Sequence, residues 1–247
     1  MAINWFTSCM SFKELIKKIN KHRKPLLAVL IDPDKFNPEL VQLANRSRVT
    51  CFLVGGSKLE KGDLGTTVSA IKKRSEIPVV LFPGDETQLS KKADGLLLLS
   101  LLSGRNPDYL IEKHIRAAPV IKKMKLGYLS TAYLLIDGGK TSVTQEVTNT
   151  TPLDPANTDY IVNTAIAAEQ LGFKAIYLEA GSGAAKNVSP RLIKKIKKEV
   201  NIPLIVGGGI DSPQKVKAAI KAGANMIVVG NALEKNVYLL TKLSSCF

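Results

Sequence analysis

Short apolar segments alternate with helix-like segments along almost the whole chain of 247 residues. Eight apolar segments are short, continuous and rich in Val, Ile and Leu, as is typical of parallel strands buried on both faces. They span residues 26–32, 51–56, 79–84, 95–102, 127–136, 175–181, 203–209 and 226–231. Eight such strands joined by helices predict a (β/α)8 barrel of the TIM type. An open, doubly wound sheet is the alternative.

Helical patterns fill most of the intervals between these strands. We expect helices over residues 38–45, 61–74, 107–123, 159–171, 189–200 and 212–221. The last two open with Ser-Pro, in which the serine caps the helix and the proline suits its first turn. The chain therefore has the start signals that a barrel of alternating strands and helices requires.

Two intervals depart from that pattern. Residues 85–94 are too few for a full crossover helix between the third and fourth strands. Residues 137–157, after the fifth strand, are too many for an ordinary connection, and long structureless loops are commonly lids or binding loops. We therefore expect a modified barrel that lacks a full third helix and carries a binding loop on its catalytic face.

Length and composition predict one domain over residues 1–247, with residues 1–25 as an N-terminal helical extension. The content of hydrophobic residues is 45%, which is ample for one large core. The most apolar run, residues 95–104, is too short to span a membrane. No signal-peptide pattern opens the chain, and its three cysteines are scattered. We expect a cytoplasmic protein.

The net charge is +14, and the basic residues cluster at 13–24, 71–76, 191–200 and 215–221 with apolar residues at helical spacing. The simplest interpretation is the solvated outer faces of amphipathic helices. Attraction to phosphorylated substrates, or a transient contact with an anionic membrane surface, is the functional alternative. Nucleic acid is not expected, because aromatic residues make up only 6% and no nucleic-acid motif is present.

Glycine-rich turns follow the seventh and eighth predicted strands. The first reads VGGGIDSP over residues 206–213 and the second reads VGNA over residues 229–232. In such barrels the loops after these two strands often hold phosphate beside a helix N-terminus, here expected at Ser212 and Pro213. Glycine N–H groups can point at the anion, although glycine also serves tight turns with positive φ. Two such turns on consecutive late strands favour a phosphate site.

Polar side chains follow other strands at the same end of the barrel: Asp32 and Asp34 after the first, Ser57 after the second, and Tyr177, Glu179 and Ser182 around the end of the sixth. A carboxylate and a hydroxyl on neighbouring strands suit Mg²⁺, which keeps several waters and shares substrate phosphates. Asp32 could equally cap the helix that follows it. Glu179 could serve as a base, or instead form a structural ion pair with a lysine.

Taken together, IDPDK, VGGS, YLEAGSGA, VGGGI and VGNALE, in this order, resemble the geranylgeranylglyceryl phosphate synthase family from about residue 26 to residue 236. The resemblance implies a modified (β/α)8 barrel without a full third helix. It also implies a Mg²⁺-dependent prenyltransferase that joins an isoprenoid diphosphate to the 3-hydroxyl of sn-glycerol 1-phosphate, the first ether bond of archaeal-type lipids.

The family's site residues fall on matching positions of this chain. The resemblance implies Asp32 and Ser57 as Mg²⁺ ligands. For the reaction that it implies, our candidate catalytic residues are Glu179, which would take up the hydroxyl proton, Tyr177, which would position the acceptor, and Asp32, which would hold the metal. The resemblance also implies that glycerol 1-phosphate is bound by Tyr177, Leu178, Glu179, Ala180, Gly181, Ser182, Gly183, Gly208, Gly209, Gly230 and Asn231.

One position sets this chain apart within the family. Bacterial relatives that prefer longer prenyl chains carry a lysine two positions before the aspartate, where this chain has Leu30. The resemblance therefore favours the archaeal-type branch and a C20 donor. It also implies a homo-oligomer, either a dimer or a hexamer.

Two other classes of function remain open. A barrel isomerase, aldolase or synthase acting on a sugar phosphate would share the late-strand glycines, and would need an acid–base pair or a Schiff-base lysine, for which Lys35 is the candidate. A non-catalytic protein that binds phosphate or a membrane surface is the other alternative.

Overall fold

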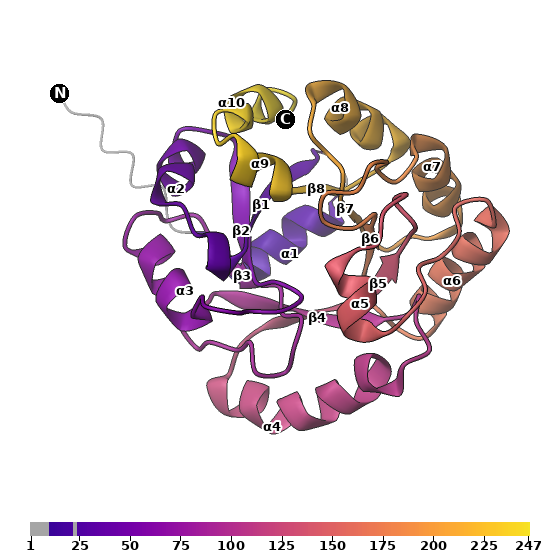
Figure 1. The fold of residues 1–247 in the computed structure, drawn as a ribbon, viewed down its shortest axis with the longest axis horizontal. Helices are drawn as coiled ribbons and strands as arrows, with labels where there is room; N and C mark the ends of the chain where they lie inside the picture. The colour runs from indigo at the N-terminus through magenta and orange to yellow at the C-terminus, as the bar shows by residue number, and fades with distance from the viewer. Residues whose placement is uncertain (1–9, 22–23) are drawn as a thin grey trace.

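A computed structural model describes residues 10–21 and 24–247. Eight parallel strands form a closed barrel in sequential order, and β1 pairs with β8 to close it (Figure 1). The strands are β1 (Leu26–Ile31), β2 (Val49–Val54), β3 (Val79–Leu81), β4 (Gly95–Leu101), β5 (Tyr128–Leu135), β6 (Ala175–Glu179), β7 (Leu204–Gly207) and β8 (Met226–Val229). The predicted barrel is confirmed, and closure rules out the open sheet.

Helices surround the barrel in sequence order. They are α2 (Pro38–Asn45), α3 (Leu64–Lys72), α4 (Lys113–Met124), α6 (Thr158–Gln170), α7 (Pro190–Glu199), α8 (Pro213–Ala222), α9 (Asn231–Lys235) and α10 (Leu239–Ser244), with a 3-10 turn η1 (Pro33–Lys35) and a π-helical turn η2 (Asp108–Glu112). Ser189 and Ser212 cap α7 and α8 as predicted. Residues 82–94, all of them described, form no helix, so the third helix of the barrel is missing as expected.

The connection after β5 differs from the prediction of a structureless loop. It contains α5 (Val143–Thr148), whose N-cap Ser142 accepts a hydrogen bond from the amide of Gln145. Ile136 bridges to Leu153, so the segment leaves the barrel and returns to it. The polar, threonine-rich sequence hides this helix because its stability comes from capping and from contact with the barrel rather than from an apolar face.

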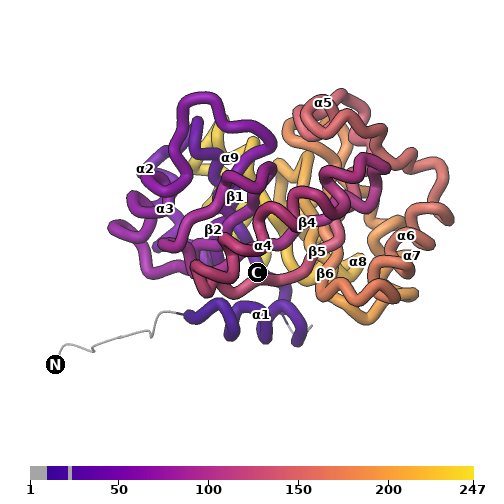
Figure 2. The backbone as a smooth tube through the Cα atoms, turned by 90° about the horizontal axis from the view of Figure 1, so that it is seen from below, coloured from indigo at the N-terminus to yellow at the C-terminus, as the bar shows by residue number. Residues whose placement is uncertain are grey.

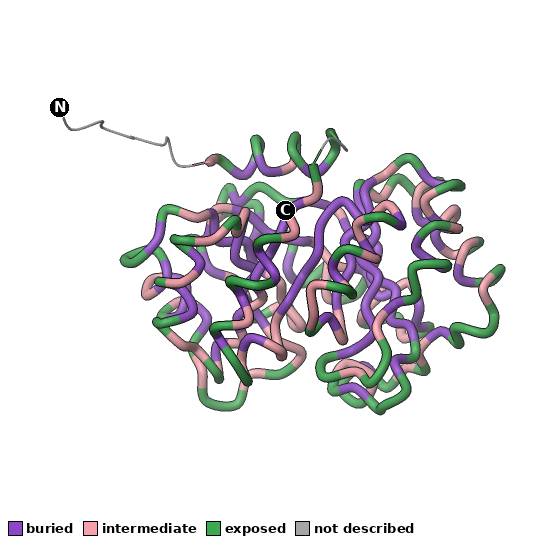
Figure 3. The backbone as a smooth tube through the Cα atoms, turned by 90° about the horizontal axis from the view of Figure 1, so that it is seen from above, coloured by how far each residue is buried: buried purple, intermediate pink, exposed green. Residues whose placement is uncertain are grey.

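An additional helix, α1 (Phe12–Asn20), lies across the amino-terminal end of the barrel, opposite α5 and α9 (Figure 2). Phe12, Leu15 and Ile19 are buried against the barrel interior, while the lysines between them are exposed (Figure 3). The predicted extension over residues 1–25 is therefore helical over Phe12–Asn20. Its residues 1–9 and 22–23 lie outside the described residues.

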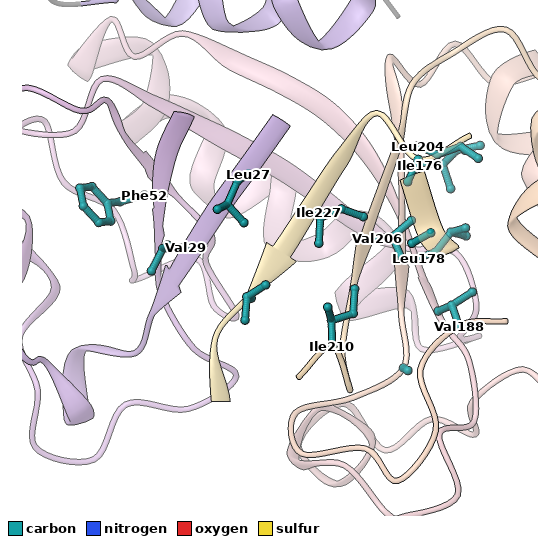
Figure 4. Packing of buried hydrophobic residues seen from close by; sticks show 14 of the residues in the cluster. Leu27, Val29, Phe52, Ile176, Leu178, Val188, Leu204, Val206, Ile210 and Ile227 are labelled. Carbon is teal, nitrogen blue, oxygen red and sulfur yellow. The ribbon is translucent and has the colours of Figure 1, made fainter. Parts of the chain in front are cut away.

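Alternating side chains of the strands form two apolar layers. One set packs outward against the helices and includes Leu27, Phe52, Ile176, Leu178 and Val206 (Figure 4). The other set fills the barrel interior together with α1, and contains Leu53, Leu97, Tyr133, Tyr177 and Ile205. Along each strand the side chains therefore point alternately outward and inward. Only the inward-pointing side chains can reach the cavity at the carboxyl end of the barrel.

Candidate active site

A pocket lies at the carboxyl end of the barrel, where the strands feed into their loops. Most of the residues predicted for the site line it: Asp32, Ser57, Tyr177, Glu179, Ser182, Gly183, Gly208, Gly209, Gly230 and Asn231. They come from β1, β2, β6, β7, β8 and the segments after them. The structure thus brings together residues that are up to about two hundred positions apart in the chain, because parallel strands all end at one face.

Three predicted residues do not line this pocket. Leu178 points outward and packs against the helices, since it alternates with Tyr177 and Glu179 along β6. Ala180 also belongs to the outer layer. The amide of Gly181 donates to Oε1 of Glu179 at 2.7 Å. These three positions therefore shape the site through the backbone rather than through a side chain.

The turn after β7 requires glycine for a steric reason. Gly208 has φ of +80° and Gly209 has φ of +66°, a left-handed conformation that disfavours other residues. A Cβ at Gly208 would overlap Oε1 of Glu179 and lie 2.7 Å from the amide nitrogen of Ala180. The β7 turn thus lies directly against the end of β6, which leaves a backbone-lined cradle of the kind that holds phosphate.

The helix whose first residues line the pocket is α9 and not α8. Gly230 and Asn231 line the pocket, whereas Ser212 and Pro213 do not. Gly183 faces Asn231, since a Cβ at Gly183 would lie 3.6 Å from its Oδ1. The sequence pointed to α8 because its Ser-Pro start is the stronger signal. The Ser212 side chain caps α8 itself, since its hydroxyl oxygen accepts a hydrogen bond from the amide of Lys215 at 3.4 Å.

Glu179 and Tyr177 form the buried polar centre of the pocket. Glu179 is 6% exposed, and this burial raises the pKa of its carboxyl group to about 7. The Tyr177 hydroxyl is fully buried and lacks a hydrogen-bond partner within the described part of the chain. No lysine pairs with Glu179 among these residues, so the structural ion pair is absent there. A buried hydroxyl without a partner and a carboxyl that titrates near neutrality are typical of a binding site for polar ligand groups.

Aromatic rings form the floor beneath Glu179. The rings of Tyr133 and Tyr177 stack with centroids 5.3 Å apart, and Phe82 lies 5.1 Å from Tyr177. Sequence reasoning missed Tyr133 and Phe82, although their position near the carboxyl ends of predicted strands was a usable signal. These rings separate the polar site from the apolar barrel interior.

Asp32 caps the turn that follows it, which is one of the two roles that the sequence left open. Its Oδ1 accepts the amide of Asp34 at 3.0 Å and so caps η1, while Oδ2 lies 3.8 Å from Nζ of Lys35. Burial raises the pKa of its carboxyl group. Gly56, the residue before Ser57, lies beside Asp32, because a Cβ at Gly56 would lie 3.5 Å from Oδ1 of Asp32. Two hard oxygen donors on adjacent strands, facing open pocket volume, fit a Mg²⁺ ion that takes its other ligands from phosphate and water.

Asp34, by contrast, has a structural role. Its carboxylate accepts the amides of Glu60 and Lys61 at 2.8 Å each, and also that of Gly62. These bonds lower the pKa of Asp34 and tie the turn after β1 to the loop after β2. No cluster of three or more His, Cys, Asp or Glu side chains suited to a metal occurs among the described residues.

An apolar groove leads away from this pocket where the third helix is missing. Its walls come from the segment after β3, from β4 and from α4, and include Leu96, Leu98, Leu101, Ala117 and Ile121. Gly56, Ser57, Phe82, Tyr133 and Thr144 line both cavities. The predicted binding segment joins the two there, since Oγ1 of Thr144 lies 2.9 Å from Oγ of Ser57. The short interval at residues 85–94 was the sequence signal for this groove.

A barrel with a backbone cradle on its last two strand ends, a buried carboxyl group and an adjoining apolar groove belongs to the class of phosphate-binding TIM barrels. Comparison with known proteins narrows this class. Residues 17–244 match the PcrB family, and the chain belongs to that family.

Two relatives and one solved structure show how close the similarity is. Geranylgeranylglyceryl phosphate synthase of Zunongwangia profunda is 46% identical over 91% of this chain and 97% of the relative. The protein of the same name in Methanosphaera stadtmanae is 39% identical over 92% and 93%. The crystal structure of (S)-3-O-geranylgeranylglyceryl phosphate synthase of Thermoplasma acidophilum, in complex with sn-glycerol-1-phosphate, has a TM-score of 0.88 at 31% identity and covers 96% of this chain and 98% of that chain.

Proposed function

We propose that this chain joins geranylgeranyl diphosphate to the 3-hydroxyl of sn-glycerol 1-phosphate. The observation that carries this proposal is the junction of two cavities at Ser57, Phe82, Tyr133 and Thr144. One cavity offers backbone amides and a buried carboxyl group, and the other offers an apolar wall. A reaction between a small polar phosphate and a long apolar diphosphate needs both, side by side. The relatives' shared name supports the same reaction.

The acceptor would lie over the late-strand turns. Gly208, Gly209 and Gly230 allow close approach of its phosphate to the backbone, and Asn231 lies beside them. Its hydroxyl groups would then reach Glu179 and Tyr177. With a pKa of about 7, Glu179 is half ionised near neutral pH and suited to take up the proton of the attacking hydroxyl.

The donor would extend from the junction into the groove, with its diphosphate beside Asp32 and Ser57. In the reaction, the bond between prenyl C1 and diphosphate oxygen breaks, the bond between C1 and the glycerol oxygen forms, and the hydroxyl proton goes to Glu179. Asp32 and Ser57 would hold Mg²⁺, which when bound neutralises the charge that develops on the departing diphosphate. The phosphate cradle orients the acceptor toward C1.

The structure weakens the sugar-phosphate alternative. A Schiff-base lysine needs a lowered pKa, but Nζ of Lys35 lies 3.0 Å from Glu234, and that hydrogen bond raises its pKa. A sugar phosphate also has no use for an apolar groove. We therefore favour the prenyl transfer reaction.

We also propose a homo-oligomer acting in the cytoplasm. Ile111, Ile115 and Val120 on η2 and α4 are 53%, 58% and 41% exposed, which supports a self-associating face. Within the described part of the chain, every helix is too short or too polar to cross a membrane. Light scattering coupled to size exclusion would measure the number of subunits.

The test of the reaction uses radiolabelled glycerol phosphate. The purified chain is incubated with geranylgeranyl diphosphate, Mg²⁺ and either sn-glycerol 1-phosphate or its 3-phosphate enantiomer, and the products are extracted into an organic solvent. We expect label from the 1-phosphate to enter the organic phase and label from the enantiomer to stay in water, because two anchors make the site chiral. Label that stays in water with both acceptors would reject the proposed function.

A further inference from the structure

The positive charge of the chain gathers at the amino-terminal end of the barrel, away from the active site. In a parallel barrel every helix ends where the next strand begins, so helix C-termini and strand starts share this face. Exposed lysines on it are Lys13, Lys17, Lys18, Lys21, Lys24, Lys122, Lys123, Lys125, Lys174, Lys198 and Lys221. We call these residues the basic end face. None of them forms an ion pair within residues 10–21 and 24–247.

Acidic residues do little to offset this charge. Those at the same end are Glu14, Glu76, Asp94, Glu169 and Glu199. Glu14 forms the capping box of α1, Asp94 pairs with Lys72, and Glu169 accepts the amides of Asn201 and Ile202. Most of the carboxylates are thus engaged in local structure, while the lysines of the basic end face point to solvent.

Helix dipoles account for only part of the pattern, since α2 and α6 carry acidic residues in the first turn but α7 and α8 do not. A lysine near a helix C-terminus is stabilised by the dipole, but so is an acidic residue near the N-terminus. Both α7 and α8 carry lysines in the last turn and no acidic residue in the first. The α1 helix, which lies across this end of the barrel (Figure 2), adds three exposed lysines to the face. An anionic surface would complement the charge that the dipoles leave unexplained.

We propose that the basic end face docks on an anionic lipid bilayer. Two exposed apolar side chains lie on the same face: Tyr128, the first residue of β5, is 55% exposed, and Leu171, the C-cap of α6, is 73% exposed. A tyrosine and a leucine among lysines suit the boundary between lipid headgroups and acyl chains. A leucine contributes nothing to binding the phosphate backbone of a nucleic acid, which is why a bilayer fits better.

The apolar groove runs toward this face, and its far end is closed by buried side chains. Its lining begins at Ser57 and Thr144 near the active site and continues to Leu96 and Ile121, at the start of β4 and the end of α4. Ile121 directly precedes Lys122 and Lys123, and Phe12 of α1 contacts the positions of Gly95 and Gly127. Docking would therefore bring the closed far end of the groove close to the bilayer surface. This consequence rests on the proposed function, whereas docking itself does not.

Vesicle sedimentation tests the docking. The whole chain is mixed with vesicles of phosphatidylcholine, with or without phosphatidylglycerol, at low and at high salt. We expect binding to the anionic vesicles only, and loss of that binding at high salt. The variant Lys122→Glu/Lys123→Glu/Lys125→Glu should partition about a hundredfold less onto them. Its turnover with substrates in free solution should match the wild type, so the docking and the reaction fail separately.

A matched control changes the charge equally at the other end of the barrel. The variant Lys61→Glu/Lys140→Glu/Lys186→Glu alters exposed lysines in loops at the carboxyl end and should keep wild-type binding to the vesicles. Equal loss in both variants, or no binding by the wild type, would overturn the proposal. If the α4 variant fails to fold, replacing Lys13, Lys17 and Lys18 of α1 by Gln makes the same test. Binding of a DNA duplex at lower protein concentration than the vesicles would overturn the assignment to lipid.

Discussion

Gly208 lies against the carboxylate of Glu179 so closely that any side chain at position 208 would overlap Oε1 of Glu179. The glycine of the β7 turn and the buried acid of β6 are thus one unit. The close approach leaves room for the backbone alone, and the backbone is the part that would contact a phosphate group. The predicted phosphate cradle and the predicted base therefore depend on each other.

Replacing Gly208 by Ala tests this contact, with Gly172→Ala as its control. Both glycines have positive φ, +80° and +88°, but nothing lies within 4 Å of an added Cβ at Gly172. The free energy of unfolding should fall by about 1 kcal/mol in Gly172→Ala and by about 3 kcal/mol in Gly208→Ala. Urea unfolding measures both. Only Gly208→Ala should raise the KM for glycerol phosphate; equal effects of the two changes would argue against the overlap.

Glu179→Gln should make the stability of the protein less dependent on pH. The folded-state pKa of about 7 lies above the ordinary value of 4.5, so the folded state holds the proton more tightly. Stability is therefore greatest below pH 4.5 and falls as the pH rises through 7, where ionised Glu179 costs about 3 kcal/mol. The glutamine removes this cost, so the variant should be the more stable protein in alkaline buffer and equal to the wild type in acid. If the stability of the two proteins changed equally with pH, the raised pKa assigned to Glu179 would be contradicted. The kcat of Glu179→Gln should also fall.

Asp32→Asn should impair metal binding and activity, whereas Asp34→Asn should impair stability. An asparagine at position 32 can still accept the amide of residue 34, so the fold should persist while Mg²⁺ binding, measured by calorimetry with diphosphate present, weakens along with activity. Asp34→Asn removes charge from the acceptor of three backbone amides, and should lower the melting temperature. An Asp32→Asn protein with wild-type activity at limiting Mg²⁺ would remove Asp32 from the metal site.

Ala117→Phe should block the groove, with Ala118→Phe as its neighbour on the same helix. Ala117 is buried and lines the groove, whereas Ala118 is exposed. Steady-state kinetics should show a raised KM for geranylgeranyl diphosphate in Ala117→Phe, an unchanged KM for glycerol phosphate, and a smaller penalty for shorter prenyl donors. Ala118→Phe should behave as wild type. An equal loss of activity with prenyl donors of every length would indicate that the prenyl chain does not bind in this groove.

The strands could be predicted because each is a continuous apolar run, and the predicted 26–32 and 127–136 correspond to Leu26–Ile31 and Tyr128–Leu135. Strand ends were predicted less well. The run at 79–84 is a strand only over Val79–Leu81, since the chain leaves the sheet before its proline and glycine. The residues of the Asp and Gly motifs line one pocket, because the carboxyl ends of all the strands meet at one face.

Other features of the site depend on contacts that a sequence does not show. Asp32 and Asp34 lie two positions apart in one motif, yet one caps η1 beside the proposed metal site and the other holds a loop. The pairing of Ser57 with Thr144 joins positions 87 residues apart. The pocket is lined by the start of α9, where the sequence predicted the start of α8. The turn after β8 meets β1 at this point, and Gly230 lies beside Leu30.

The partners that cover α1 are synthesised long after α1 itself. Phe12 packs at Gly95 and Gly127, and the side-chain amide of Asn225 donates to the carbonyl oxygen of Ile19, 206 residues earlier in the chain. At ribosomal rates the last of these partners emerges about 10 to 40 s after α1. Until that residue emerges, the apolar face of α1 is covered only in part, which gives chaperones or the lysines of α1 a role in keeping the nascent chain dispersed.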